Sequence, residues 1–247
     1  MDLMNTSTAN TPSEVILCKF GEIVLKGANR QNFESGLVKE LRRRASPFGT
    51  FKIYFKQSTI YVEPLNDNCD MEGMYAAAKK VFGIVAVNRA AVCEKNMDAI
   101  AEAIRAWAPA QLSQYKTFKV EAKRSDKRFP LTSVDISREM GGVILSMMPH
   151  LRVDVRNPEI IVHVEVREFG AYIHAGQFKG AGGLPVGTNG KGLLLLSGGI
   201  DSPVAGWMMA KRGVKIEAVY YEAFPYTSIE AREKVIELAR IVAGWAG

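Results

Sequence analysis

An apolar run of four leucines leads directly into a glycine-rich turn near the end of this chain. Residues 193–203 read Leu-Leu-Leu-Leu-Ser-Gly-Gly-Ile-Asp-Ser-Pro. Such an unbroken run is typical of a strand buried on both faces of a parallel sheet, and Gly198 and Gly199 permit a sharp turn after it. A helix over residues 201–212 follows, because Pro203 suits a first helical turn and Gly213 stands just past its end. The pattern predicts a strand, a tight loop and a helix.

The loop has the composition of an anion-binding site. Its glycines let backbone N–H groups approach a ligand, and the helix N-terminus adds the positive end of its dipole. Ser197 and Ser202 add hydroxyl donors, and Asp201 either helps to hold Mg²⁺ or caps the helix. The segment is not a Walker loop, and no Gly-x-Gly-x-x-Gly follows a strand. We therefore predict nucleotide binding of another kind, with a plain turn and helix cap as the alternative.

A second strand over residues 214–221 and a last helix over 228–245 complete this region. Thr227 and Glu230 have the spacing of a capping box for that helix. Strand, helix, strand and helix form the start of an α/β doubly wound sheet, which usually carries about five or six strands. We therefore expect the domain over residues 193–247 to be incomplete.

The residues before this region predict an α+β fold in two parts. The first, residues 14–70, is a strand, a helix capped by Asn29 with Phe33, Leu37 and Leu41 on one face, and two short strands. The second part, residues 71–176, begins with an alanine-rich helix. Two further helices are expected at 97–112 and 133–147, and strands at 84–92, 117–122, 152–155, 160–166 and 171–174. Seven glycines from 176 to 192 indicate a linker over 177–192 or backbone close to a ligand. Residues 1–13 read as a disordered polar tail.

Composition narrows the class of protein only a little. The 247 residues are 47% hydrophobic and 23% charged, which is typical of a folded chain, and the net charge of +6 favours an anionic partner such as nucleic acid. No signal peptide or membrane-spanning run is evident, so we expect a cytoplasmic protein without membrane contact. No Cys-x-x-Cys pair and no metal-ligand spacing occurs, so structural roles are expected for Cys18, Cys69, Cys93, His150, His163 and His174.

A basic stretch follows the strand at 117–122. Lys123, Arg124, Lys127 and Arg128 surround a single aspartate, and Arg138 follows on the next helix. Such clusters are usually solvated surface, whereas contact with RNA would go mainly to phosphates. The arginines at 42–44 either complement a helix dipole or extend such an RNA-binding surface.

Two sets of motifs resemble known families. Residues 197–202, Ser-Gly-Gly-Ile-Asp-Ser, resemble the signature of the PP-loop ATP pyrophosphatases. That resemblance implies that the loop holds the terminal phosphates of ATP, that a carbonyl oxygen is adenylated with release of pyrophosphate, and that a nucleophile then displaces AMP. Longer segments, in the family's own order, resemble the tRNA 4-thiouridine synthetases, or tRNA sulfurtransferases: residues 19–34 the opening, residues 122–130, 153–158 and 164–168 the RNA-binding THUMP domain, and residues 182–188 the linker to the PP-loop domain.

The second resemblance implies a ferredoxin-like domain over 14–70, a THUMP domain over 71–176 and a PP-loop domain over 193–247. It implies ATP- and Mg²⁺-dependent thiolation of a tRNA uridine, with sulfur from a cysteine desulfurase, and in some members sulfur supply to a small carrier protein for thiamine synthesis. The ATP contacts it implies are Leu195, Leu196, Ser197, Gly198, Gly199, Asp201, Ser202, Tyr220 and Tyr221. Members often show His-Phe where this chain has the tyrosine pair. The RNA contacts it implies are Lys123, Arg124, Lys127, Arg128 and Arg138.

The family's catalytic cysteine is expected beyond Gly247, so we expect no complete thiolation cycle from these residues alone. Two other functions remain as alternatives. One is a different PP-loop adenylating enzyme, such as an amide-forming ligase, and the other is an inert RNA-binding module with a remnant loop.

Overall fold

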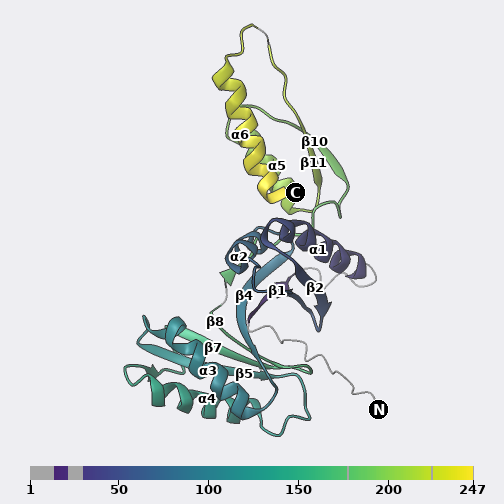
Figure 1. Cartoon of the computed structure of the whole chain (residues 1–247). Coiled ribbons are helices and arrows are strands. Elements are labelled where there is room, and N and C mark those ends of the chain that lie inside the picture. Colours follow the sequence, from purple (N-terminus) through teal and green to yellow (C-terminus); the bar gives the residue numbers. More distant parts are fainter. Residues whose placement is uncertain (1–13, 22–29, 177, 224, 247) are drawn as a thin grey trace. The chain divides into compact units, whose positions relative to one another are not determined.

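The computed structural model describes residues 14–21, 30–176, 178–223 and 225–246 (Figure 1). They form two compact units: the central unit, with residues 14–16 and 88–176, and the split unit, with the described residues of 17–87 and 178–246. Strands β1 (Glu14–Phe20) and β4 (Ile84–Cys93) run through the boundary and contribute residues to both. The expected tail over residues 1–13 and the expected cap at Asn29 lie outside the described residues.

In the split unit, β2 (Phe51–Lys56), β3 (Thr59–Pro64), β1 and β4 are neighbours in that order, and β9 (Phe178–Lys179) pairs with β4. Helix α1 (Arg30–Ala45) leads into the short 3-10 helix η3 (Ser46–Phe48) and packs on β2 and on α2 (Met71–Lys79). The predicted stripe on α1 is confirmed, since Phe33, Leu37 and Leu41 are all buried. The domain limits at 70 and 176 stay predictions, although α2 belongs to the split unit by its contacts.

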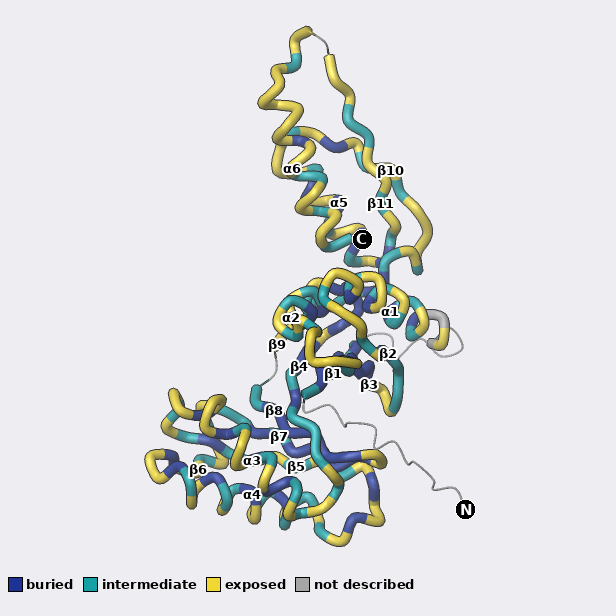
Figure 2. The backbone as a smooth tube through the Cα atoms, in the orientation of Figure 1, coloured by how far each residue is buried: buried dark blue, intermediate teal, exposed yellow. Residues whose placement is uncertain are grey.

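The central unit is a β-sheet, which includes the end of β4, with two helices on one face (Figure 2). Its strands neighbour one another in the order β8 (Ala171–Ala175), β7 (Ile160–Val166), β5 (Thr117–Arg124) and β6 (Arg152–Val153), with β5 parallel to β7. Helices α3 (Met97–Leu112) and α4 (Ser133–Met147) begin and end where the sequence predicted. Asn96 and Thr132 cap them by accepting hydrogen bonds from the N–H groups of Ala99 and Asp135.

The last part of the split unit is a two-stranded parallel sheet with two helices. It contains β10 (Lys191–Leu195), α5 (Asp201–Lys211), β11 (Lys215–Val219) and α6 (Ile229–Ala246). The predicted fold class, an α+β part followed by the start of an α/β parallel sheet, is therefore confirmed. The cap of α6 is Ser228, whose Oγ accepts from Ala231 N at 3.3 Å; the predicted cap Thr227 instead accepts from Ala223 N.

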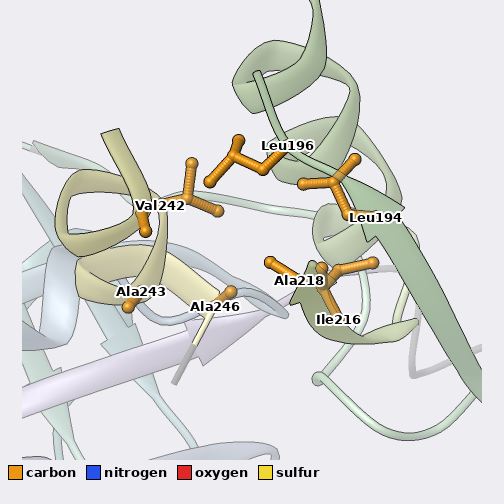
Figure 3. Close-up of a pocket in the computed structure, with 8 residues that line it drawn as sticks. Leu194, Leu196, Ile216, Ala218, Val242, Ala243 and Ala246 are labelled. Carbon is orange, nitrogen blue, oxygen red and sulfur yellow. The ribbon is translucent and has the colours of Figure 1, made fainter. Parts of the chain in front are cut away.

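The prediction that the leucine strand is buried on both faces is wrong. Leu193 and Leu195 are 68% and 62% exposed, whereas Leu196 is only 6% exposed. The reason is that both helices lie over one face of the sheet. Alternate residues of β10 turn toward α6 across an apolar cavity of about 200 Å³, lined by Leu194, Leu196, Ile216, Ala218, Ala239, Val242, Ala243 and Ala246 (Figure 3).

The glycine-rich stretch packs closely against neighbouring backbone in its described residues. Gly182 donates its N–H to Ile84 O at 2.8 Å and accepts from Gly83 N, while Gly187 donates to Gly213 O. The backbones approach so closely that a Cβ on Gly183, whose φ is +77°, would lie 2.2 Å from Lys211 O. Glycine here permits close packing between segments.

An aromatic cluster ties α5 and α6 to the rest of the split unit. Phe82, just before β4, lies 5.5 Å from the Trp207 ring and 6.1 Å from the Trp245 ring, centroid to centroid. The Arg44 guanidinium of α1 donates to the carbonyl oxygens of Gly244 and Trp245 at 2.8 Å each. A cation at these carbonyls complements the C-terminal end of the α6 dipole.

Candidate functional site

The ends of β10 and β11 lie side by side. The strands pair in parallel from Lys191 with Lys215 to Leu195 with Val219, and Leu196 N then donates to Val219 O at 2.9 Å. The loop after β10 and the two residues after β11 therefore leave the sheet at the same edge. Ligands of open α/β sheets bind at this carboxyl edge, and here residues 196–202, Tyr220 and Tyr221 all follow strands that end at it.

Two serines close the loop over the first turn of α5. Ser197 N donates to Ser202 Oγ at 2.9 Å, the two Oγ atoms lie 3.1 Å apart, and Gly199 N lies 3.4 Å from Ser197 Oγ. No side chain caps the N-terminus of α5. Its first amides therefore remain open to an anion, as at other helix N-termini that bind phosphate.

The fold itself does not require a glycine at position 199. Neither Gly198 nor Gly199 has a positive φ, and a Cβ on Gly199 would meet only Ser197 Oγ, at 3.5 Å. A side chain could therefore be accommodated there in the absence of a ligand. Close approach of a ligand to the backbone supplies a reason for glycine that the packing does not.

Asp201 is exposed in the first turn of α5. The alternative that Asp201 caps this helix is wrong, because no side-chain cap is formed. Among the described residues, no three His, Cys, Asp or Glu side chains gather where they could hold a metal ion. An exposed carboxylate beside an anion loop nevertheless fits Mg²⁺, which is commonly held by one or two carboxylates together with phosphate oxygens and water.

Within each of the two predicted ATP-contacting pairs, Leu195 with Leu196 and Tyr220 with Tyr221, the residues differ in exposure. Leu196 turns toward the cavity under α6, whereas Leu195 is on the open face, because successive strand residues point to opposite sides (Figure 3). Tyr220 is half-buried and Tyr221 is 78% exposed. Both rings follow the end of β11, where a flat aromatic surface can stack on a base.

The basic turn between β5 and α4 is held by hydrogen bonds from its own cations. The Arg124 guanidinium donates to the carbonyl oxygens of Phe129 and Leu131 at 2.8 and 3.1 Å. Asp126, almost buried, accepts from Arg128 Nε at 3.1 Å and from Lys95 Nζ at 2.7 Å. Hydrogen bonds from Arg128 and then Lys95 hold the pKa of the Asp126 carboxyl well below its ordinary value.

The five predicted RNA contacts therefore divide into two groups. Arg124 and Arg128 shape the turn, while Lys123 and Lys127 are exposed, and neither has an ion pair within the described part of the chain. Arg138 on α4 is also exposed, with Asp135 at 3.5 Å. Sequence reasoning missed Lys95, which lies far from the turn in sequence and carried no local signal.

The three arginines that end α1 also have specific partners. Arg42 Nη2 donates to Ile53 O on the edge strand β2, and Arg43 pairs with Glu40 at 2.7 Å. Arg44 pairs with Glu40 and also reaches the end of α6. These contacts account for the three arginines as part of the folded structure. They do not favour an extension of the basic surface.

Cys18 and Cys93 lack the features of reactive thiols. Burial raises the pKa of Cys18 to about 12, and burial, aided by Glu94, raises that of Cys93 to about 11. Only the thiolate is a strong nucleophile, so neither sulfur is poised for attack near neutral pH. Cys69 donates to Thr50 O at 3.2 Å.

Comparison with known families gives three matches along the chain. The profile described as "ThiI ferredoxin-like domain" matches residues 15–88, that of the THUMP domain matches 94–174, and that of "Thiamine biosynthesis protein (ThiI)" matches 187–247. The chain belongs to the ThiI family. The resemblance seen in the sequence is thereby confirmed, and the loop and basic turn described above lie within the ThiI and THUMP matches respectively.

Individual ThiI relatives match along nearly the same residues. A probable tRNA sulfurtransferase of Acetivibrio thermocellus is 49% identical over 232 residues, which cover 93% of this chain and 59% of the relative. One from Alkaliphilus oremlandii is 47% identical over 236 residues, covering 94% and 59%. The crystal structure of a 4-thiouridine synthetase–RNA complex with bound ATP superposes with a TM-score of 0.84 at 36% identity, covering 94% of this chain and 59% of that one.

The chain thus spans about three fifths of the length of these curated relatives. No helix in the described residues is long and apolar enough to cross a membrane.

Proposed function

We propose that this chain carries the ATP-binding loop and the RNA-binding part of a tRNA sulfurtransferase that makes 4-thiouridine. The observation that carries the proposal is the shared edge of β10 and β11, from which both the serine-closed loop at residues 197–202 and the pair Tyr220 and Tyr221 leave the sheet. Support also comes from the ThiI relatives named as probable tRNA sulfurtransferases and from the synthetase crystallised with RNA and ATP.

The chemistry begins with the triphosphate of ATP at the loop. Backbone N–H groups around Gly198 and Gly199 and the open N-terminus of α5 stabilise phosphate charge that develops as pyrophosphate leaves. Mg²⁺, when bound, neutralises phosphate oxygens, and Asp201 is the residue of this chain that would help to hold it. Tyr220 and Tyr221 orient the adenine by stacking.

The acceptor in this proposal is a tRNA uridine. Adenylation of its carbonyl oxygen turns that oxygen into a good leaving group, and a sulfur nucleophile then displaces AMP. The sulfur would come as a persulfide from a cysteine desulfurase, and transfer to a thiamine-pathway carrier protein is a further activity of the same chemistry. Cys18 and Cys93, with their raised pKa values, are unsuited to receive the persulfide.

RNA binding in the proposal falls to the central unit. Lys123, Lys127 and Arg138 present their charges at the surface, and the turn that carries the two lysines is held in shape by Asp126. Contacts of this kind go to phosphates and depend strongly on salt.

The test is a reconstitution with the intact protein, ATP, Mg²⁺, unmodified tRNA and a persulfide donor. We expect 4-thiouridine in the digested tRNA by mass spectrometry, with one AMP released per thiolated uridine and none without tRNA. AMP release that does not depend on tRNA would instead indicate another PP-loop enzyme, such as an amide-forming ligase. RNA binding without any ATP binding would indicate an inert RNA-binding module.

A further inference from the structure

The phosphate loop contains no positively charged side chain. Residues 196–203 read Leu-Ser-Gly-Gly-Ile-Asp-Ser-Pro, and their one ionisable group is the carboxyl of Asp201. A Walker loop, by contrast, places a lysine on the β- and γ-phosphates from within its own motif. Backbone dipoles supply only partial charges, so a side-chain cation that acts on the triphosphate beside Mg²⁺ has to come from another element.

Helix α6 brings such a cation to the loop. A Cβ built on Gly198 would lie 4.0 Å from Lys234 Cδ and 3.8 Å from Val235 Cγ2. Val235 is the one buried residue of α6 and is 3% exposed. It therefore fixes this turn of the helix against the loop, and the neighbouring Lys234 extends from a position that is fixed as well. Figure 1 shows α6 alongside α5, the helix that the loop begins.

The ammonium of Lys234 is available for a ligand. Lys234 is exposed, and no carboxylate in the described residues lies within 4.0 Å of its Nζ. Arg232 on the same helix, by contrast, pairs with Glu222 at 3.7 Å. The Nζ atom lies two bonds beyond Cδ on a flexible stem, so it can reach over the loop as a compact point charge.

We propose that Lys234 binds the β- and γ-phosphates of ATP and so supplies the cation that the loop lacks. This inference rests on the proposed ATP-binding function of the same loop. It predicts that Lys234 distinguishes ATP and pyrophosphate from AMP, because AMP has no phosphate beyond the first.

The test compares nucleotide affinities of the intact wild-type protein with those of Lys234→Met and Lys234→Arg by calorimetry. Lys234→Met should weaken binding of ATP and of inorganic pyrophosphate about tenfold, the usual loss for one charge-assisted hydrogen bond, and leave AMP affinity unchanged. Lys234→Arg should retain most of the ATP affinity. Arg240→Met is the matched control, since it removes an exposed cation about 9 Å further along the same helix and should change nothing.

The outcomes distinguish the role of Lys234 from the proposed ATP-binding function. Wild-type ATP affinity in Lys234→Met, or an equal loss for ATP and AMP, would overturn the role of Lys234 while the proposed function stands. Failure of the wild-type protein itself to bind ATP would overturn both. Thermal unfolding should be the same in all variants, since the Lys234 side chain is exposed. If Lys234→Met unfolds at a lower temperature, Lys234→Arg tests the phosphate contact instead. Loss of ATP affinity in Lys234→Arg would then contradict the proposed role of Lys234.

Discussion

Leu196 donates its backbone N–H to the carbonyl oxygen of Val219 at 2.9 Å, which extends the pairing of β10 and β11 to their last residues. This one bond decides which segments can share a ligand. It keeps the strands in register to the point where the loop begins after Leu196 and where Tyr220 follows β11. The nucleotide site proposed above depends on this alignment, and its parts can be tested separately.

The tyrosine pair should contribute to adenine binding. Replacing Tyr220 and Tyr221 together by alanine should weaken ATP and AMP to a similar extent, by about 1–3 kcal/mol per stacked base. The double phenylalanine variant is the control and should keep most of the affinity, because stacking needs the ring and not the hydroxyl. A loss for ATP alone would argue against adenine stacking.

Gly199→Val should abolish ATP binding without unfolding the protein. Its Cβ would make only an ordinary contact with Ser197 Oγ in the ligand-free fold, but the branched side chain would stand where the phosphates approach the backbone. Gly183→Ala is the contrasting variant and should lower the melting temperature. Its Cβ would lie 2.2 Å from Lys211 O, and the residue has a φ of +77°. Calorimetry and thermal unfolding distinguish the two. Normal ATP affinity in Gly199→Val would contradict the loop assignment.

Lys123→Ala with Lys127→Ala should weaken tRNA binding and reduce its salt dependence. Each lost phosphate contact lowers the slope of log K against log salt by about 0.7–0.9, so the pair should lower it by one to two. The melting temperature should not change, because both side chains are exposed. Arg124→Ala should instead lower the melting temperature, since it removes two hydrogen bonds to the turn. An unchanged slope in the lysine variant would show that these charges are solvated surface.

Asp126 should stabilise the central unit in a pH-dependent way. Its pKa lies below the ordinary 3.8 in the folded protein, because Arg128 and Lys95 donate to the carboxylate. The stabilisation is present above that ordinary value and is lost as pH falls toward the folded pKa. Asp126→Asn should therefore melt earlier than wild type at pH 7, with a difference that shrinks below about pH 4. A difference that stays constant from pH 7 to pH 3 would contradict this role.

Local signals made much of the fold predictable. The bounds of α3 and α4 follow from capping residues one position before each helix and from apolar residues at helical spacing. The loop at 197–202 was evident because its residues are contiguous. Packing between distant segments was not predictable, because it depends on which elements meet. Examples are the exposure of Leu193 on a sheet covered on one face, the reach of Arg44 to Trp245 carbonyl, and the approach of Lys234 to Gly198.

The most direct test of the central claim is tRNA thiolation by the Asp201→Ala variant of the intact protein, measured beside its tRNA affinity. Asp201 is exposed and caps no helix, so its loss should leave the fold unchanged. The account predicts that ATP-dependent formation of 4-thiouridine is abolished while tRNA binds with nearly wild-type affinity. Full thiolation by Asp201→Ala would contradict the assignment of this loop as the ATP site.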